Sequence, residues 1–236
     1  MVSASCHQED VAIERGHIVL RLSTDDAVST RALQDVSNVE TWHANVSNES
    51  ETLYDGLIGN GLETMLFDAG VYAIDVRNYD TMADANNASN GWGAAYHEGS
   101  ASNVLVSAGG TAYVNISCGR ALNAKFRLDY SEFSGVIDGF AITVPRTITF
   151  SHADGTLANE AFFAPNATIT YTITYTIAGE TKTTTARTLT LGGAATVSTL
   201  RIKSDIHGQL SISLTCDNEF EGDAQSDITI DGASGK

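Results

Sequence analysis

Histidines and serines, which could act in catalysis or metal binding, are spread along this sequence without the spacing of a catalytic motif or a metal site. A zinc site needs ligands that converge, yet no HxH or HExxH pair occurs among the six histidines: His7, His17, His43, His97, His152 and His207. A G-x-S-x-G segment is absent, and the terminal DGASGK lacks the spacing of a phosphate-binding loop. We therefore predict that the protein is not an enzyme and uses no cofactor.

One acidic segment, CDNEFEGDAQSD at 216–227, contains oxygen ligands of the kind that calcium prefers. The candidates are Asp217, Glu219, Glu221 and Asp223, with Asn218 beside them. Their spacing does not match an EF-hand loop, and a solvated acidic loop is the alternative interpretation. The sequence therefore predicts no metal site, and these residues are only weak calcium candidates.

Three aromatic residues, Trp42, Trp92 and Tyr96, are candidates for ligand contact. Trp92 and Tyr96 lie in DTMADANNASNGWGAAYHEGSAS, 80–102, which has no periodicity and is predicted to be a long surface loop. An exposed ring there could stack on a sugar or fill a pocket in a partner. The alternative is that these rings fold back and close the end of a domain.

The charge of the chain excludes some classes of partner. The formal net charge is −16, from 29 acidic and 13 basic residues. Such a chain repels the phosphates of nucleic acids and anionic membrane surfaces. No segment has the 18 or so consecutive apolar residues of a membrane span. We expect neither a nucleic-acid partner nor direct membrane insertion.

The three cysteines, Cys6, Cys118 and Cys216, have different surroundings. Cys118 and Cys216 continue the apolar faces of predicted strands, so we expect buried free thiols, with a disulfide between them as the alternative. Cys6 lies in SASCHQED, which has the form of a bacterial lipoprotein cleavage site. No hydrophobic leader precedes it in this sequence, so either the sequence is truncated at its start, or Met1 is not the natural start site, or the likeness is accidental.

Period-two alternation is the strongest structural signal. In TITYTITYTI, 168–177, isoleucine or tyrosine takes every odd position and threonine every even one. Successive side chains of a strand point to opposite faces, so the odd positions should be buried. A turn at 178–180 should place Ile177 opposite Thr181 and Leu189 opposite Ile169.

Further alternating segments predict about fifteen strands in total. Inward faces are expected for two segments, with Ile18, Leu20 and Leu22 in one and Tyr72, Ile74 and Val76 in the other. We also predict a strand at 62–67, a hairpin at 103–118 that turns near Gly109 and Gly110, and no clear helix. So many strands favour an all-β, mostly antiparallel fold of two tandem β-sandwich domains, at 16–120 and 121–236, after a tether at 1–15.

Several segments resemble the fimbrillin-like surface lipoproteins of Bacteroidetes, with their Ig- or transthyretin-like sandwiches. The nearest likeness is to a family of cell-adhesion proteins classed as a domain of unknown function. The segments are GHIVLRLSTDDAV, DAGVYAIDV, NVLVSAGGTAYVNISCGRALNAKFRLDYSEF and EAFFAPNATITYTITY, together with Cys6. The likeness covers essentially the whole chain, although Asp68 stands where that family usually has proline.

The resemblance implies export, a lipid on Cys6, attachment to the outer membrane and display at the cell surface. In pilus-forming relatives an arginine-specific protease removes the first strand, and a strand of a partner replaces it. Arg31, in STRALQ, would be the cleavage site, with a solvated arginine as the alternative. Asp80-Thr81-Met82 resembles the O-glycosylation motif of this bacterial group, which makes Thr81 a candidate.

These observations lead to three hypotheses of function. The first is a lipid-anchored cell-adhesion protein, or a tip, anchor or stand-alone member of a fimbria-like assembly, that contacts surface, fimbrial or host proteins or glycans. The chain ends in ITIDGASGK without a long donor tail, which argues against a repeating shaft subunit. The second is a glycan-binding lipoprotein of a carbohydrate-uptake system. The third is a structural surface subunit without a ligand.

Overall fold

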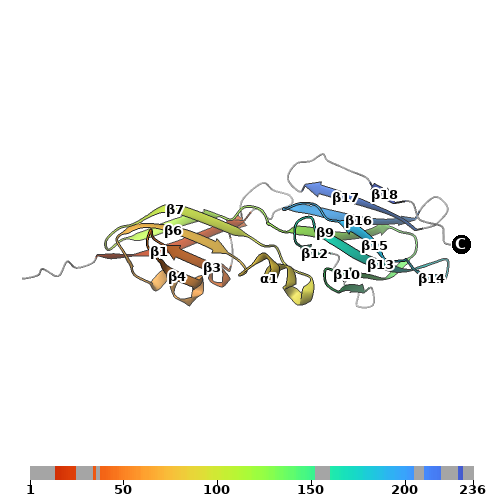
Figure 1. Cartoon of the computed structure of the whole chain (residues 1–236), viewed down its shortest axis with the longest axis horizontal. Coiled ribbons are helices and arrows are strands. Elements are labelled where there is room, and N and C mark those ends of the chain that lie inside the picture. Colours follow the sequence, from red (N-terminus) through yellow and green to blue (C-terminus); the bar gives the residue numbers. More distant parts are fainter. Residues whose placement is uncertain are drawn as a thin grey trace, which may run out of the picture. The chain divides into compact units, whose positions relative to one another are not determined.

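The computed structural model describes residues 14–24, 34–35, 38–151, 160–204, 210–218 and 228–230, most of which lie in strands (Figure 1). The chain divides into two compact units. Unit 1 is formed by the described parts of Met1–Thr24, Gln34–Arg77 and Gly99–Cys118, and unit 2 by those of Asp25–Leu33, Asn78–Glu98 and Gly119–Lys236. The predicted all-β fold is confirmed. The segment Asn78–Glu98 packs with unit 2, although the predicted domain boundary at residue 120 would place it in the first domain.

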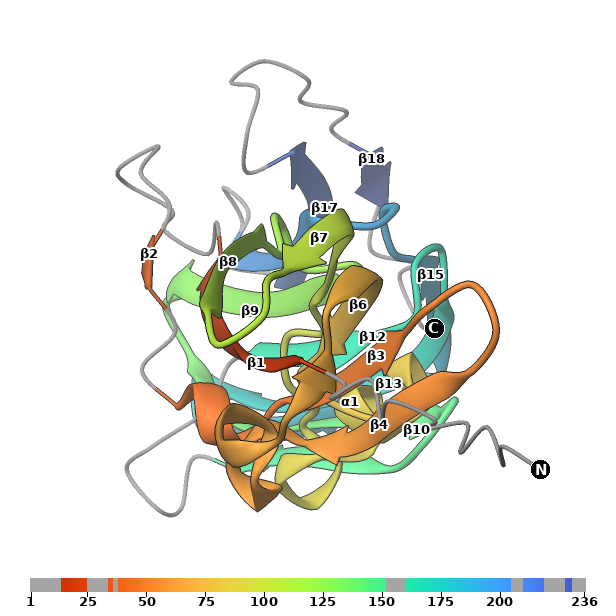
Figure 2. The ribbon, with the colours of Figure 1, turned by 90° about the vertical axis from the view of Figure 1, so that its left-hand side faces the viewer.

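Unit 1 consists of two sheets that form the layers of a sandwich (Figure 2). One sheet contains β1 (Arg15–Thr24), β2 (Gln34–Asp35), β5 (Phe67–Asp68) and β8 (Thr111–Ser117). The other has the order β4 (Thr52–Leu57), β3 (His43–Ser47), β6 (Gly70–Arg77) and β7 (Glu98–Val106). Three short 3-10 helices, at Val39–Thr41, Ile58–Asn60 and Leu62–Thr64, connect the strands.

The core of unit 1 contains side chains from both sheets, as period-two alternation requires. Both predicted inward faces are confirmed, because the following side chains are all buried: Ile18, Leu20, Leu22, Tyr72, Ile74 and Val76. Burying each large apolar side chain contributes about 1.5–3 kcal/mol to stability. Cys118 belongs to this core as a free thiol, as predicted, and burial raises its pKa to about 11.

Two local predictions for unit 1 were wrong. The segment at 62–67 is a 3-10 helix followed by the two-residue strand β5, because only Leu62 and Phe67 of this segment are buried. β7 and β8 do not form a hairpin, since β8 pairs in parallel with β1 along His17–Ser23 while β7 lies beside β6 in the opposite sheet. Alternation determines which face of a strand is buried but not which strand lies next to it.

Unit 2 is likewise built from two sheets. The first contains β10 (Val136–Val144), β11 (Ile148–Ser151), β13 (Thr168–Ile177), β14 (Glu180–Thr183) and β15 (Arg187–Thr190). The second has the order β12 (Glu160–Phe163), β9 (Ala124–Glu132), β16 (Thr196–Ser204), β17 (Leu210–Asn218) and β18 (Ile228–Ile230). β16 runs parallel to β9, whereas the other pairings described in this unit are antiparallel.

The alternating strand β13 lies at the centre of unit 2. Ile169, Tyr171 and Ile173 are fully buried, as predicted, whereas Tyr175 and Ile177, predicted for the same face, are only half-buried. Leu189 lies opposite Ile169, as predicted. The opposite face carries paired threonine hydroxyls, at 3.3 Å, 3.1 Å and 2.7 Å: Thr168–Thr190, Thr174–Thr183 and Thr176–Thr181.

The turn after β13 differs from its prediction. Ile177 pairs with Glu180 rather than with Thr181, because Ala178 and Gly179 form a two-residue turn with φ values of 52° and 82°. A turn with two positive φ values matches the twist of the strands. The register then shifts by one residue between β14 and β15, so Leu189 still reaches its predicted position.

Among the described residues, no helix has the length and apolar character needed to cross a membrane.

Candidate functional site

The segment Asn78–Glu98 carries two of the predicted ligand-contact aromatics and is not the long loop that its composition suggested. It contains the helix α1 (Met82–Asn87), the 3-10 helix Ser89–Gly91 and the first residue of β7. Thr81 caps α1, because its hydroxyl accepts a hydrogen bond from the Asp84 amide at 3.2 Å and donates to Asp84 Oδ2 at 2.6 Å. A threonine three residues before an acidic residue is a helix-start signal, so α1 could have been predicted.

Asn78 holds the chain that follows α1 in an extended form. Its amide Nδ2 donates to the Ala95 carbonyl at 2.8 Å, and its Oδ1 accepts from the His97 amide at 2.9 Å. The backbone amide of Asn78 also donates to the His97 carbonyl. An asparagine side chain that pairs with backbone groups on both sides acts much like a short neighbouring strand.

Asn123, which precedes β9, fixes the same segment from the other side. Its Oδ1 accepts from the Tyr96 amide at 3.1 Å, and its Nδ2 donates to the Ala94 carbonyl at 2.8 Å and to Asn86 Oδ1 at 2.9 Å. Asn123 is only 1% exposed. A buried amide with all of its strong groups bonded holds its neighbours in one geometry.

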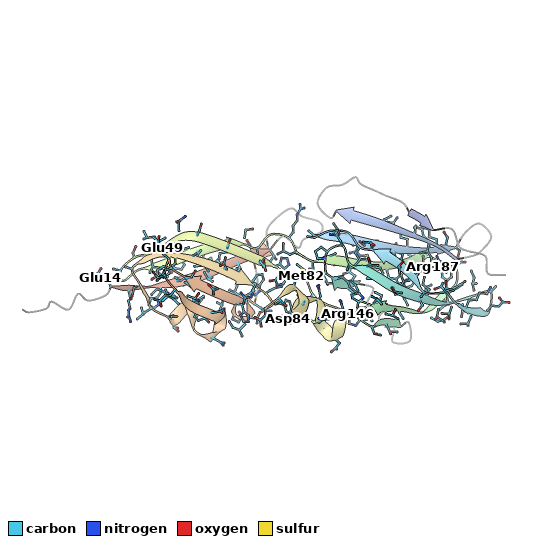
Figure 3. All side chains as sticks on the ribbon, in the orientation of Figure 1. Glu14, Glu49, Met82, Asp84, Arg146 and Arg187 are labelled. Carbon is cyan, nitrogen blue, oxygen red and sulfur yellow. The ribbon has the colours of Figure 1, made fainter. Side chains whose placement is uncertain are left out.

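Arg146, which precedes β11, attaches the same segment to β12. Its Nε donates to the Gly91 carbonyl at 2.6 Å, its Nη2 donates to the Phe162 carbonyl, and its guanidinium lies 4.3 Å from the centre of the Phe163 ring. Figure 3 shows Arg146 at the end of unit 2 that also carries α1, with Met82 and Asp84 labelled. Burial lowers the pKa of Arg146, so its contacts must offset a desolvation cost.

The backbones of the segment and of β12 approach each other closely at Gly93. The Phe162 amide donates to the Trp92 carbonyl at 2.8 Å. A Cβ at Gly93 would lie 2.9 Å from both Cβ and O of Phe162, and the φ of Gly93 is +78°. Only glycine combines this conformation with this contact.

Where the segment meets the sheet, unit 2 has a pocket of about 220 Å³. Its lining comes from this segment, from β9 and β12, and from the residues that lead into or begin β9 and β16: Ala95, Ala121, Asn123, Lys125, Phe162, Ala195 and Thr196. Three alanines give the pocket smooth walls, and Phe162 provides its aromatic ring. The Lys125 ammonium lies 5.5 Å from the centre of that ring and directly across the strand pair from it.

A compact ion cluster adjoins the pocket. Glu160 Oε2 lies 3.2 Å from Lys125 Nζ, and Glu160 Oε1 accepts from Arg127 Nε at 2.8 Å and Nη2 at 2.7 Å. Burial opposes ionisation of Glu160, but the hydrogen bond from Arg127 and the charge of Lys125 outweigh it, so the pKa of Glu160 is lowered. The carboxylate is therefore ionised at neutral pH.

The three aromatic residues predicted to contact a ligand are buried or half-buried, and none of them lines the pocket. Trp42 is 6% exposed and packs in the core of unit 1, and Tyr96 is 4% exposed with its hydroxyl donating to Glu98. Trp92 is half-buried against the core of unit 2. The aromatic residue that lines the pocket is Phe162, which is not among the predicted ligand-contact residues. Alternation in β12 gives the signal, since Ala161 and Phe163 point inward.

The other candidate residues are not brought together. Thr81 is exposed and caps α1. In the described ranges, no three His, Cys, Asp or Glu side chains gather in a way that could hold a metal ion. Five candidates lie outside the described residues: Cys6, Arg31, Glu219, Glu221 and Asp223.

No protein-family model matches the sequence, and no curated protein matches it either. Among solved structures, the tip fimbrial protein Mfa3 of Porphyromonas gingivalis is similar, at 11% identity and a TM-score of 0.43 over 84% of this chain and 98% of that one. A fimbrial assembly protein of Parabacteroides distasonis is similar at 10% identity and a TM-score of 0.42, over 84% of this chain and 94% of that one. A fimbrial protein of Bacteroides ovatus is similar at 8% identity and a TM-score of 0.36, over 79% of this chain and 50% of that one. Likeness at this level carries no argument about function.

Proposed function

We propose that this chain is a non-enzymatic, exported surface protein that acts in cell adhesion or as a tip, anchor or stand-alone member of a fimbria-like assembly. The observation that carries the proposal is the pocket of unit 2, whose walls are held in place by Asn78, Asn123 and Arg146. A preformed recess with one aromatic ring and a few polar groups is typical of a binding site. The sequence resemblance to fimbrillin-like surface lipoproteins supplies the cellular setting.

The groups at the pocket suit binding rather than catalysis. Asn123 has its side-chain groups engaged in the structural hydrogen bonds described above, and Thr196 donates its hydroxyl to the Gly193 carbonyl at 2.8 Å. Lys125 is already beside a carboxylate. Rigid walls lower the entropy cost of binding, which is what a recognition site gains from this construction.

Contacts with proteins are supported by apolar side chains on unit 1. Val71 and Leu105, on the neighbouring strands β6 and β7, are 53% and 65% exposed, and Tyr113 on β8 is 65% exposed. Exposed apolar groups of this size lose contact with water when a partner covers them. Surface or fimbrial proteins and host proteins are the partners that fit this proposal.

Attachment to the outer membrane would depend on Cys6. We expect the chain, expressed with its natural export signal, to fractionate with the outer membrane and to be digested by protease added to intact cells. A Cys6→Ala variant should be released in soluble form, because a lipid chain supplies the membrane affinity. Wild-type protein found inside the cell would refute the proposed location.

Assembly by strand replacement would require cleavage after Arg31. Mature protein isolated from cells should then lack the residues before position 32, and an Arg31→Gln variant should retain them and stay monomeric. An intact, monomeric wild-type protein on the cell surface would exclude this route and leave the stand-alone adhesin.

Adhesion itself can be tested with cells that display the chain. We expect display to increase attachment to a host-cell layer or to sister cells, and a Phe162→Ala or Leu105→Ser variant to reduce it. Lys203→Met is a matched control, because Lys203 lies in unit 2 but does not line the pocket. Equal attachment with and without the displayed chain would refute an adhesive role.

A second candidate function is glycan capture in a carbohydrate-uptake system. The specific observation is that Phe162, Lys125 and Thr196 surround one small pocket with an aromatic ring, a cation and a hydroxyl. A glycan array with Phe162→Ala as the control tests this candidate. Binding that is unchanged by Phe162→Ala, by Trp92→Ala and by Tyr96→Phe would exclude this end of unit 2 as the sugar site.

A further inference from the structure

We propose that the pocket of unit 2 binds a single acidic sugar residue of the hexuronic acid type, with its carboxylate on Lys125 and its ring against Phe162. This inference rests on the second candidate function and names the chemical class of its ligand.

The charge next to the pocket favours a carboxylate. Arg127 takes one oxygen of Glu160 through two short hydrogen bonds, whereas Lys125 approaches the other oxygen at 3.2 Å. Within the described part of unit 2, these two cations share this one carboxylate, which leaves an excess of one positive charge. The Lys125 side chain is 20% exposed, and its ammonium has three N–H donors. A second carboxylate can therefore join the cluster.

This local charge contrasts with the rest of the protein. The chain carries −16 overall, so its long-range field repels anions. Only short-range contacts at Lys125 can then select a negatively charged ligand. Because salt screens this long-range repulsion more strongly than a contact of a few ångströms, the preference for a negatively charged sugar should persist when salt is added.

The size of the pocket limits the ligand to one ring. At about 30 Å³ for each water molecule in the liquid, 220 Å³ holds roughly seven waters. Drug-sized ligands occupy pockets of about 300–1,000 Å³. Phe162 provides a flat apolar surface, and the methyl groups of Ala95, Ala121 and Ala195 complete a smooth wall. The C–H face of a pyranose ring fits such a surface.

The polar groups favour a sugar over a peptide. The Thr196 hydroxyl donates to the Gly193 carbonyl, so its oxygen is oriented to accept a hydrogen bond from a ligand hydroxyl. A peptide is usually held through backbone groups. In Ala94–His97, the amides of residues 94, 96 and 97 and all four carbonyls are hydrogen-bonded within unit 2. This wall therefore has little to offer a peptide backbone.

The test is calorimetric titration of the purified 236-residue chain with glucuronate, glucose and N-acetylglutamate, at one fixed salt concentration. We expect glucuronate to bind at millimolar concentration, at least about tenfold more tightly than glucose, as one charge-assisted hydrogen bond provides. Lys125→Met should weaken glucuronate binding about tenfold or more, and Lys203→Met, which breaks the similar pair with Glu132, should not. Glu160→Gln should tighten it, since the competing carboxylate is removed.

Each outcome decides the proposal. Equal binding of glucose and glucuronate, no binding of glucuronate, or tighter binding of N-acetylglutamate would overturn it. If Lys125→Met does not fold, the preference of the wild type for glucuronate over glucose and the Glu160→Gln result carry the test, and glucuronate binding that Glu160→Gln leaves unchanged would overturn it. Binding of a neutral sugar alone would leave the glycan-capture function standing, whereas a glycan array on which no sugar binds would remove that function as well.

Discussion

Replacing Arg146 with methionine should loosen the segment Asn78–Glu98 from unit 2. Methionine keeps an apolar chain against the Phe163 ring but removes the donors to the Gly91 and Phe162 carbonyls. Each hydrogen bond from a charged donor contributes about 1.5–3 kcal/mol, and the cation–π contact about 0.5–2 kcal/mol. Loss of the guanidinium also ends its desolvation cost, so we expect the free energy of unfolding of unit 2 to fall by about 3 kcal/mol.

Two measurements test the expected fall in the free energy of unfolding. Urea denaturation gives the change in free energy of unfolding, and hydrogen exchange locates it, because amides at 85–97 should exchange faster than those of β13. Arg21→Met is the matched control: Arg21 lies over the exposed Tyr113 ring at 5.6 Å in unit 1, where such a contact contributes only about 0.5–1 kcal/mol.

The role of the guanidinium in holding the segment can be refuted in two ways. A loss below about 0.5 kcal/mol for Arg146→Met, the size expected of an ordinary surface substitution, would refute it. Unchanged protection at 85–97 would refute it as well. If Arg146→Lys equals the wild type, the charge alone suffices and the two-carbonyl geometry is not required.

Three further predictions concern single groups. Cys118, whose pKa is raised to about 11 by burial, should resist iodoacetamide at mildly alkaline pH until urea unfolds unit 1, as peptide mapping can check. Tyr171→Phe should leave the unfolding free energy unchanged or raise it by up to about 1 kcal/mol, because this buried hydroxyl has no hydrogen-bond partner among the described residues; a clear loss would contradict this. The folded state lowers the pKa of Glu160 below its ordinary value of 4.5. The ion pairs of Glu160 therefore stabilise the folded state above pH 4.5, and this contribution is lost as the pH falls through the folded pKa. Glu160→Gln should therefore lower the urea midpoint of unit 2 at neutral pH and match the wild type in acid, and equal midpoints at both pH values would contradict the argument.

The recognition surface was harder to predict than the fold. Trp92 and Tyr96 were singled out because aromatics in a polar, aperiodic segment suggest exposure, yet the asparagines Asn78 and Asn123 draw that segment onto unit 2. Hydrogen bonds between residues tens of positions apart leave no periodic signal. Phe162 has such a signal, since alternation in EAFF places one phenylalanine inside and one outside.

The sequence by itself determined the inward faces of strands such as β1, β6 and β13, because alternation follows from the geometry of a single strand. It also determined the strongly acidic surface and the buried thiol of Cys118. Only the tertiary structure decided that β8 pairs with β1, that Asn78–Glu98 packs in unit 2, and that Lys125 and Phe162 line one pocket. The physical reason is that strand neighbours and pocket walls depend on contacts between distant segments, which the order of residues in one strand does not encode.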